Sequence, residues 1–510
     1  MKKLTVILLC VVFLLCATAG CTPGDTVAST ATGEKAGNAQ PQGDDALSVG
    51  FSRVDITPEL DVRQGYLSQL WDAERIESPL RLSCIAITDK LDNTILLITA
   101  DANVMDSNLL LDIYGRIYDE LGVPMPNVIV STTDTMFAPS LFVGDEPSVA
   151  YKNMFADQCV EACRLAMADR SEAEMYTGTT SIDGLNFIND TIQTNGVYLG
   201  RGYTQDWRIN LKSFISTPDN EIQLLRFARS CGKDIVMMNW RGAPHTYHKT
   251  AIDDTAISAG YVRYCVGEAE KKMDCHVAFY QGACGNVDDY SYILGAGKAR
   301  SHIQMGKMLA QQAMSILPEL KKVNSNIIEI KSVDYRGNIR LDSEEYIEAA
   351  RLYWNTVAYG GEAWEAVAAT GGMCRTLAAN IGVKQRQSAY KRNEGKYELP
   401  LTAISIGDVA FINTPNYMFD NTGKQIKDAS PFQQTFILNT VAMDSASNLP
   451  YLVSEPAYTY GNEQKELSYF VKGTAEEVAG VYTDMLKQLY QDEMPDGFIT
   501  TFDSKLSNDT

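Results

Sequence analysis

Histidine is scarce in this sequence, with only four residues among 510. Because imidazole is a common ligand of catalytic metals, a histidine-rich metal centre can form at few places. The sequence also lacks a G-x-S-x-G nucleophile elbow, an H-E-x-x-H zinc motif and a P-loop. These absences exclude the reactions that such motifs support, so any catalytic site must combine residues that lie far apart in the chain.

Basic residues are also in deficit, with 44 Lys and Arg against 64 Asp and Glu and a formal net charge of −20. Sequence-independent binding of nucleic acid needs clustered Lys and Arg against the phosphates, so we expect no nucleic-acid partner. The same deficit argues against electrostatic adhesion to anionic lipid. With 45% hydrophobic and 21% charged residues, the composition is that of a globular protein and excludes a disordered chain or a coiled coil.

Cysteine pairs with metal-binding or redox spacing are missing, since none of the eleven cysteines forms a C-x-x-C pair. Cys84 and Cys275 lie in apolar runs, which predicts small buried side chains. A disulfide scaffold is not expected in a chain of this length, although one or two bridges stay open.

The N-terminus has the features of an export signal. Two lysines precede the apolar run Leu4–Cys16, which is too short to span a bilayer, and small residues lead to Cys21. This pattern resembles a bacterial lipoprotein signal and predicts a signal peptide over 1–20, a lipidated Cys21 and a flexible tether over 21–47. We expect an exported, cell-surface lipoprotein held in the membrane by its lipid anchor. The alternative is ordinary cleavage after Ala19 and secretion.

Apolar strand-like runs alternate with helical segments in the rest of the chain. This predicts an α/β domain over 48–490 with a mixed β-sheet core flanked by helices, followed by a polar tail over 491–510. The predicted strands are 83–88, 93–100, 127–131, 221–227, 234–240, 275–281, 327–335, 401–407, 409–413 and 435–441. The predicted helices are 107–121, 150–169, 255–272, 298–317, two or three within 343–391 broken at paired glycines, and 474–490.

Several motifs in this domain resemble the neutral/alkaline non-lysosomal ceramidases, in the same order along the chain. They are Gly50–Pro58, Ile95–Asp101, Asn127–Pro139, Met238–Trp240, Phe279–Asn286, Ile406–Asp408 and Ala457–Gly461. The resemblance implies the catalytic domain of that family without its C-terminal immunoglobulin-like domain. It also implies hydrolysis of an amide bond, with ceramide as the named substrate, by one zinc ion held by two histidines, a glutamate and a tyrosine.

The first two ligand positions of the family carry different residues here. Where the family has Thr-His-Thr-His, this chain has Thr133 to Met136, which places Asp134 at the ligand and Met136 beside it. Aspartate can bind zinc, but a thioether is a poor ligand for it. At the second position the chain reads Ala243-Pro244-His245, so the ligand is either lost at Ala243 or retained at His245.

The remaining positions diverge as well. The family glutamate corresponds to Tyr417, which removes a charge, and the ligand tyrosine corresponds to either Tyr451 or Asn448. In the loop after Asn286, Asp288 stands near the position where relatives carry Ser or Asn. The leading hypothesis is therefore a catalytically degraded amide-hydrolase domain that binds a lipid or another N-acyl ligand.

Two alternatives stay open. His245 and His248 share one loop and, with Asp134, could form a remodelled zinc site for an active metal-dependent N-acyl amide hydrolase. The third hypothesis is a scaffold or interaction lipoprotein without catalysis. Cys284 is a candidate nucleophile only if one of these histidines serves as its base. His276 and His302 are expected to be structural.

Overall fold

We analysed a computed structural model of the chain. It describes residues 47–491, except 67–68, 143, 195, 197, 200–210, 246–254, 292–299, 324–326, 441, 444–450 and 462. The predicted signal peptide, Cys21, most of the tether and the tail therefore lie outside the described residues, as do His248 and Asn448.

The larger of two main sheets has nine strands in the order β16-β14-β13-β9-β1-β5-β6-β8, with β17 also paired to β9. The pairs β6–β8 and β14–β16 are parallel and the other pairs are antiparallel. Its strands are β1 (Leu47–Asp55), β5 (Arg81–Thr88), β6 (Thr94–Ala100), β8 (Val128–Thr132), β9 (Ser171–Ser181), β13 (Glu221–Arg229), β14 (Ile235–Trp240), β16 (His276–Gln281) and β17 (Lys321–Lys322).

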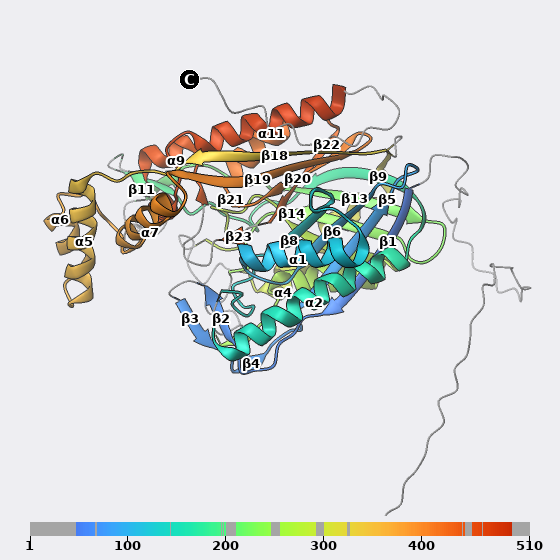
Figure 1. Cartoon of the computed structure of the whole chain (residues 1–510), viewed down its shortest axis with the longest axis horizontal. Coiled ribbons are helices and arrows are strands. Elements are labelled where there is room, and N and C mark those ends of the chain that lie inside the picture. Colours follow the sequence, from blue (N-terminus) through green and yellow to red (C-terminus); the bar gives the residue numbers. More distant parts are fainter. Residues whose placement is uncertain are drawn as a thin grey trace, which may run out of the picture. The chain divides into compact units, whose positions relative to one another are not determined.

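The second main sheet has the order β18-β19-β20-β22 and packs face to face against the first (Figure 1). Its strands are β18 (Ile328–Asn338), β19 (Lys396–Ile406), β20 (Val409–Thr414) and β22 (Gln434–Asn439). Apolar side chains of both sheets form one buried cluster, in which Phe227 and Leu97 of the first sheet meet Phe411 and Phe436 of the second. Alternating apolar positions on each strand supply this shared core.

Helices cover the two outer faces and produce a helix–sheet–sheet–helix sandwich (Figure 1). On the first sheet lie α1 (Ser107–Leu121), α2 (Glu146–Ala168), α3 (Tyr261–Met273) and α4 (His302–Ser315). On the second lie α8 (Asp420–Ala429) and α11 (Thr474–Gln491). The predicted α/β fold with a mixed sheet is confirmed.

A helical segment joins β18 to β19 at the side of this sandwich (Figure 1). It contains α5 (Glu344–Ala358), α6 (Ala363–Ala369) and α7 (Ala378–Arg392). The breaks fall at the predicted paired glycines, where Gly360, Gly371 and Gly372 have φ values of 90°, 59° and 80°. Glycine adopts this left-handed conformation without the steric cost that a side chain brings.

Short strands and helices connect the elements described above. The strands are β2 (Arg63–Tyr66), β3 (Gln69–Asp72), β4 (Arg75–Ile76), β7 (Met105–Asp106), β10 (Thr191–Gln193), β11 (Tyr198–Leu199), β12 (Leu211–Phe214), β15 (Ala256–Ile257), β21 (Tyr417–Met418), β23 (Ala442–Met443) and β24 (Tyr451–Leu452). The helices are α9 (Glu455–Tyr460), α10 (Glu463–Leu467) and the 3₁₀ turns Met125–Asn127 and Leu317–Glu319.

Two predictions of local structure need correction. The helix expected over 255–272 begins only at Tyr261, because Ala256–Ile257 pairs with β4 instead. Strand β9 was not predicted, since its sequence SEAEMYTGTTS has few apolar residues. It is nevertheless a central strand, because it pairs with β1 on one side and β13 on the other. Ala173, Met175 and Thr177 are buried on one face, while alternate residues stay partly exposed.

The cysteines agree with the prediction of small buried side chains. All eight in the described residues are free thiols, and seven of them are buried. The sulfur atoms of Cys84 and Cys163 lie 3.9 Å apart, which is a contact and not a bond.

None of the helices in the described residues is long and apolar enough to cross a membrane.

Candidate functional site

Four strands end at one place, and the loops that follow them carry the candidate residues. Strands β8, β14 and β16 of the first sheet lead into Asp134, His245 and Asp288, and β20 of the second sheet leads into Tyr417. Their carboxyl ends lie at one edge of the sandwich, because Asp134 contacts both Tyr417 and His245, and His245 contacts Asp288. This is the usual place for a site in an α/β protein.

Asp134 lies at the centre of this cluster. Its side chain is almost fully buried, and its φ of 60° is unusual for a residue with a side chain. Tyr417 Oη donates a hydrogen bond of 2.6 Å to Asp134 Oδ1. Burial raises the pKa of the Asp134 carboxyl, although the nearby His245 and the hydrogen bonds from Tyr417 and Cys284 oppose the rise. A strained, buried acid of this kind is typical of a functional position.

His245 lies between two carboxyl groups. Its Nδ1 is 3.2 Å from Asp288 Oδ1, and its Nε2 is 3.9 Å from Asp134 Oδ2. The backbone N–H of His245 also donates to Asp289 Oδ1 at 3.2 Å. Asp288 therefore orients the imidazole, and Nε2 faces Asp134.

Asp288 is itself held on several sides. Asn189 Nδ2 donates to Asp288 Oδ2 at 2.7 Å, and the backbones of Phe187 and Asp288 exchange two hydrogen bonds of 2.8 and 3.0 Å. Asp288 also forms an isolated bridge with Ala243, the residue two places before His245. Asn189 was missed in the sequence because an asparagine in a polar loop carries no signal of its own, and only the fold brings it to Asp288.

Tyr417 and Tyr451 form the second wall of the centre. Strands β21 and β24 pair in parallel with these two tyrosines in register, and their rings stack with centroids 5.0 Å apart. Gly285 lies directly against this strand, since a Cβ there would be 2.7 Å from the Tyr417 carbonyl oxygen. The pair thus joins Tyr417, at the position of the family glutamate, to Tyr451, one of the two candidates for the ligand tyrosine.

Cys284 does not have the features of a nucleophile. Its Sγ lies 3.7 Å from Asp134 Oδ2 and is buried. Burial and the adjacent Asp134 carboxyl raise the pKa of the thiol well above its ordinary value. Because the thiolate is the reactive form, this environment leaves Cys284 inert at neutral pH.

The other residues that the sequence singled out lie partly in this centre and partly elsewhere. Met136 and Ala243 are buried and make backbone hydrogen bonds to Pro244 and Val287. His248 and Asn448 lie outside the described residues, so the part of the remodelled site that depends on them stays a prediction. His276 stacks on Phe51 with ring centroids 4.6 Å apart.

His302 lies away from this centre, beside Glu77. It begins α4 and lies 3.4 Å from the Glu77 carboxylate. The interpretation of both His276 and His302 as packing residues agrees with these contacts.

The described residues do not fit the zinc that the resemblance implies. Across them, no three His, Cys, Asp or Glu side chains are grouped so that they could hold a metal ion. Two atoms bound to one tetrahedral zinc lie no more than about 3.5 Å apart, whereas His245 Nε2 and Asp134 Oδ2 are 3.9 Å apart. Asp134 Oδ2 faces His245 Nε2, whereas Asp288 contacts the other ring nitrogen of His245. The described residues therefore bring two ligands toward one point, fewer than the three protein ligands of a catalytic zinc.

Comparisons with known proteins define the class of fold. A scan of protein-family models and a search of curated protein sequences both found no match to this chain. Solved structures do match, and they show that this chain has the α/β fold of the neutral ceramidases.

Two of these structures are a neutral ceramidase from Pseudomonas aeruginosa, with a TM-score of 0.61, and a ceramidase complexed with C2, with a TM-score of 0.62. Each is 14% identical in sequence to this chain. The matches cover 90% and 91% of this chain and 77% and 78% of the two ceramidase chains. At this identity the likeness extends to the fold, and the activity must be argued from the site.

Proposed function

We propose that this chain is an exported lipoprotein whose amide-hydrolase-like domain binds an N-acyl ligand without running zinc-dependent hydrolysis. The observation that carries the proposal is the hydrogen bond between Tyr417 and Asp134. At the two positions where the resemblance assigns a glutamate and a histidine ligand, the chain has a phenol and a carboxyl group that satisfy each other. A metal at Asp134 Oδ1 would have to share that oxygen with the Tyr417 hydroxyl group.

The chemistry of the centre suits an amide. An amide group presents one acceptor and one donor, and the Asp288–His245–Asp134 series offers both kinds of partner beside the aromatic pair Tyr417 and Tyr451. The ceramidase fold supports an acyl-chain ligand, and one of the matching structures is complexed with C2. Binding in a site lined by aromatic side chains with few polar groups is typical of small-molecule recognition.

A second function is favoured by one specific observation. In metal sites, a ligating histidine commonly gives its other ring nitrogen to a carboxylate, and Asp288 stands in that relation to His245. This arrangement supports the alternative of an active hydrolase in which Asp134, His245 and His248 hold zinc.

Metal analysis and an activity assay separate the two functions. The mature chain, grown with zinc, is analysed for bound metal and assayed for fatty-acid release from N-acyl amines and from a short-chain ceramide. We expect less than about a tenth of an equivalent of zinc and no turnover, with saturable binding of a fluorescent N-acyl probe. Stoichiometric zinc together with hydrolysis that His245→Ala abolishes would instead establish the second function.

A variant tests the ligand-binding centre itself. Tyr417→Phe removes the hydroxyl that bonds Asp134 and keeps the ring that stacks on Tyr451. We expect weaker binding of the N-acyl probe, by about 3- to 30-fold, because Asp134 loses a buried hydrogen bond and the site rearranges. Tyr118→Phe on the exposed face of α1 is the matched control, and equal binding by both variants would contradict the role of Tyr417.

A further inference from the structure

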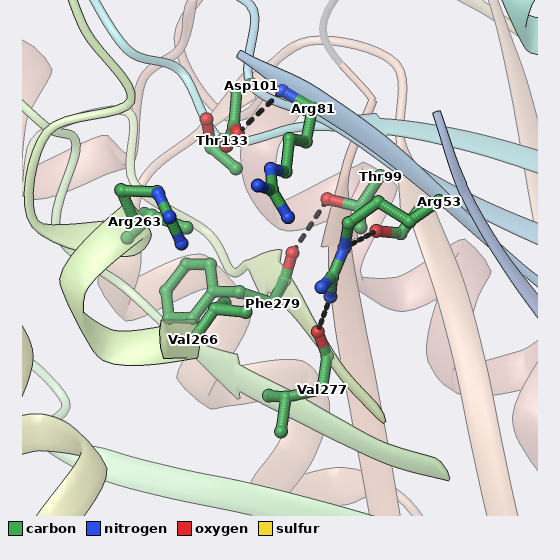
Figure 2. Close-up of a pocket in the computed structure, with 11 residues that line it drawn as sticks. Arg53, Arg81, Thr99, Asp101, Thr133, Arg263, Val266, Val277 and Phe279 are labelled. Carbon is green, nitrogen blue, oxygen red and sulfur yellow. Dashed lines mark hydrogen bonds between the residues drawn. The ribbon is translucent and has the colours of Figure 1, made fainter. Parts of the chain in front are cut away.

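We infer that a second pocket, distinct from the polar centre, binds a small oxyanion through Arg81 and Arg263. The pocket lies between the ends of β1, β5 and β6, strand β16 and the first turns of α3. It has a volume of about 30 Å³ and is partly open to solvent. Figure 2 shows the side chains of Arg81 and Arg263 reaching into it from different elements. Neither residue belongs to the candidate site described above.

The third arginine of the pocket is already fully engaged. Arg53 donates from Nε to Ser83 Oγ at 3.1 Å and from Nη2 to the carbonyl oxygen of Val277 at 2.5 Å (Figure 2). Its Nη1 donates to Glu270 at 2.8 Å. Glu270 balances its charge. Arg53 therefore joins β1 to β16 and α3, and it has a structural role.

Arg81 and Arg263 differ from Arg53 in the bonding of their guanidinium groups. Within the described part of the chain, neither guanidinium has a hydrogen-bonding or ion-pair partner, although both are only partly exposed. Each guanidinium carries five N–H donors in a planar fork that matches a carboxylate or a phosphate group. Two such groups facing one pocket without partners point to an anionic occupant.

The charges of the pocket favour an anion. Three arginines face it, Glu270 offsets Arg53, and Asp101 is the remaining acid that lines it. Asp101 Oδ2 accepts the backbone N–H of Arg81 at 3.0 Å, and with Asp101 ionised one positive charge is left over. Thr99 and Thr133 supply hydroxyl groups to the wall, and the pocket therefore matches the phosphate or carboxylate group of a small molecule.

The test measures the affinity of the mature chain for anions at constant ionic strength. Calorimetry and the shift in thermal unfolding temperature report the binding. The probes are inorganic phosphate, glycerol 3-phosphate and acetate. We expect saturable binding of at least one, and a loss of about tenfold or more in Arg81→Gln and in Arg263→Gln, because each removes charged donors. Tighter binding of glycerol 3-phosphate than of phosphate indicates a phosphorylated headgroup, and binding of acetate alone indicates a carboxylate.

Two further variants make the result decisive. Arg164→Gln removes the same charge from the exposed face of α2, where Arg164 pairs with Glu161, and should leave binding unchanged. Arg263→Lys keeps the charge but loses the fork, and we expect it to weaken binding without altering the fold. The inference is overturned if no probe shows saturable binding, or if the pocket variants bind as tightly as Arg164→Gln.

Discussion

The polar centre is formed by pairs of residues that satisfy one another. Tyr417 bonds Asp134, and Asp288 orients His245, so each polar group has a partner without a metal. Buried polar groups that lack a partner are costly, and a metal site that loses its ligands is therefore expected to acquire this kind of mutual bonding. The first two predictions concern individual side chains, the Asp134–Tyr417 pair and Asp101.

Restoring the ligand types of the family should restore zinc binding. The double variant Asp134→His with Tyr417→Glu removes the bonded pair and supplies an imidazole and a carboxylate beside His245. We expect zinc content to rise from below about a tenth of an equivalent toward one equivalent, because three nitrogen and oxygen donors suffice for a catalytic zinc. Metal analysis measures this, with Cys231→His at an exposed position as the control for added histidine. Unchanged zinc content in the folded double variant would show that the backbone no longer suits the metal.

Asp101 should make stability fall as the pH rises. Burial raises the pKa of its carboxyl from 3.8 to about 7, against the opposing effect of Arg53, Arg81 and Arg263. The folded chain thus keeps this proton to a higher pH than the unfolded chain, so the stability from this group is complete below about pH 4 and is lost as the pH passes 7. The effect is on the order of 4 kcal/mol, at about 1.4 kcal/mol per pKa unit.

Urea unfolding at pH 5, 6, 7 and 8 measures this effect. Asp101→Asn keeps the acceptor for the Arg81 N–H and removes the titration, so we expect a flatter decline of unfolding free energy across this range. Some decline remains, because burial also raises the pKa of Asp420 to about 6. Asp119→Asn on the exposed face of α1 is the control, and a slope in Asp101→Asn equal to that of the control would refute the assignment.

At the level of elements, the centre depends on how closely the loops after β16 and β20 approach each other. The Gly285 N–H donates to the carbonyl oxygen of Met418 at 2.9 Å, which joins the loop that carries Asp288 to the strand that carries Tyr417. A buried ionic group supports the same region, where Arg241 pairs with Asp219 and Lys427 of α8 pairs with Asp219 at 2.7 Å. The third prediction concerns this contact between backbones.

Gly285→Ala should destabilise the fold and displace Tyr417. The added Cβ would lie 2.7 and 2.8 Å from the carbonyl oxygens of Tyr417 and Met418, and neither backbone atom can rotate away. We expect a loss of about 1–3 kcal/mol in unfolding free energy, as for other overpacked positions. Denaturant unfolding and N-acyl probe binding measure the two effects.

Gly480→Ala in α11 is the matched control for this substitution. A Cβ at Gly480 would meet nothing within 4 Å, so alanine there should stabilise the helix by about 0.5–1 kcal/mol. If Gly285→Ala is as stable as this control and binds the probe normally, the close approach of the two loops does not hold the centre in place.

At the level of the whole molecule, the proposed attachment to the membrane is the lipid on Cys21. A Cys21→Ser variant expressed in a bacterium with lipoprotein processing should move from the detergent phase to the aqueous phase in a phase-partition assay. Its acyl chains, detected by mass spectrometry in the parent chain, should be absent. Cys231→Ser is the control, since Cys231 is an exposed free thiol in the globular domain. A parent chain that partitions into the aqueous phase would favour secretion.

Local sequence determined much of the architecture. The alternation and helical periodicity of apolar residues predicted helix α1 and the breaks between α5, α6 and α7, because these features depend on neighbours in the chain. Strand β9 was missed, since its identity as a strand comes from pairing with β1 and β13 and not from its own apolar content. The motifs also pointed to Asp134, His245, Asp288 and Tyr417 as the positions to examine.

Tertiary structure alone decided what these residues do together. Tyr417 and Asp134 are 283 positions apart, and no local pattern can state that a hydrogen bond joins them. The same holds for Asn189 on Asp288 and for Arg81 and Arg263, which come from a strand and a helix and share a pocket. The physical reason is that secondary structure follows from interactions along the chain, whereas a site follows from strand order and register, which long-range packing sets.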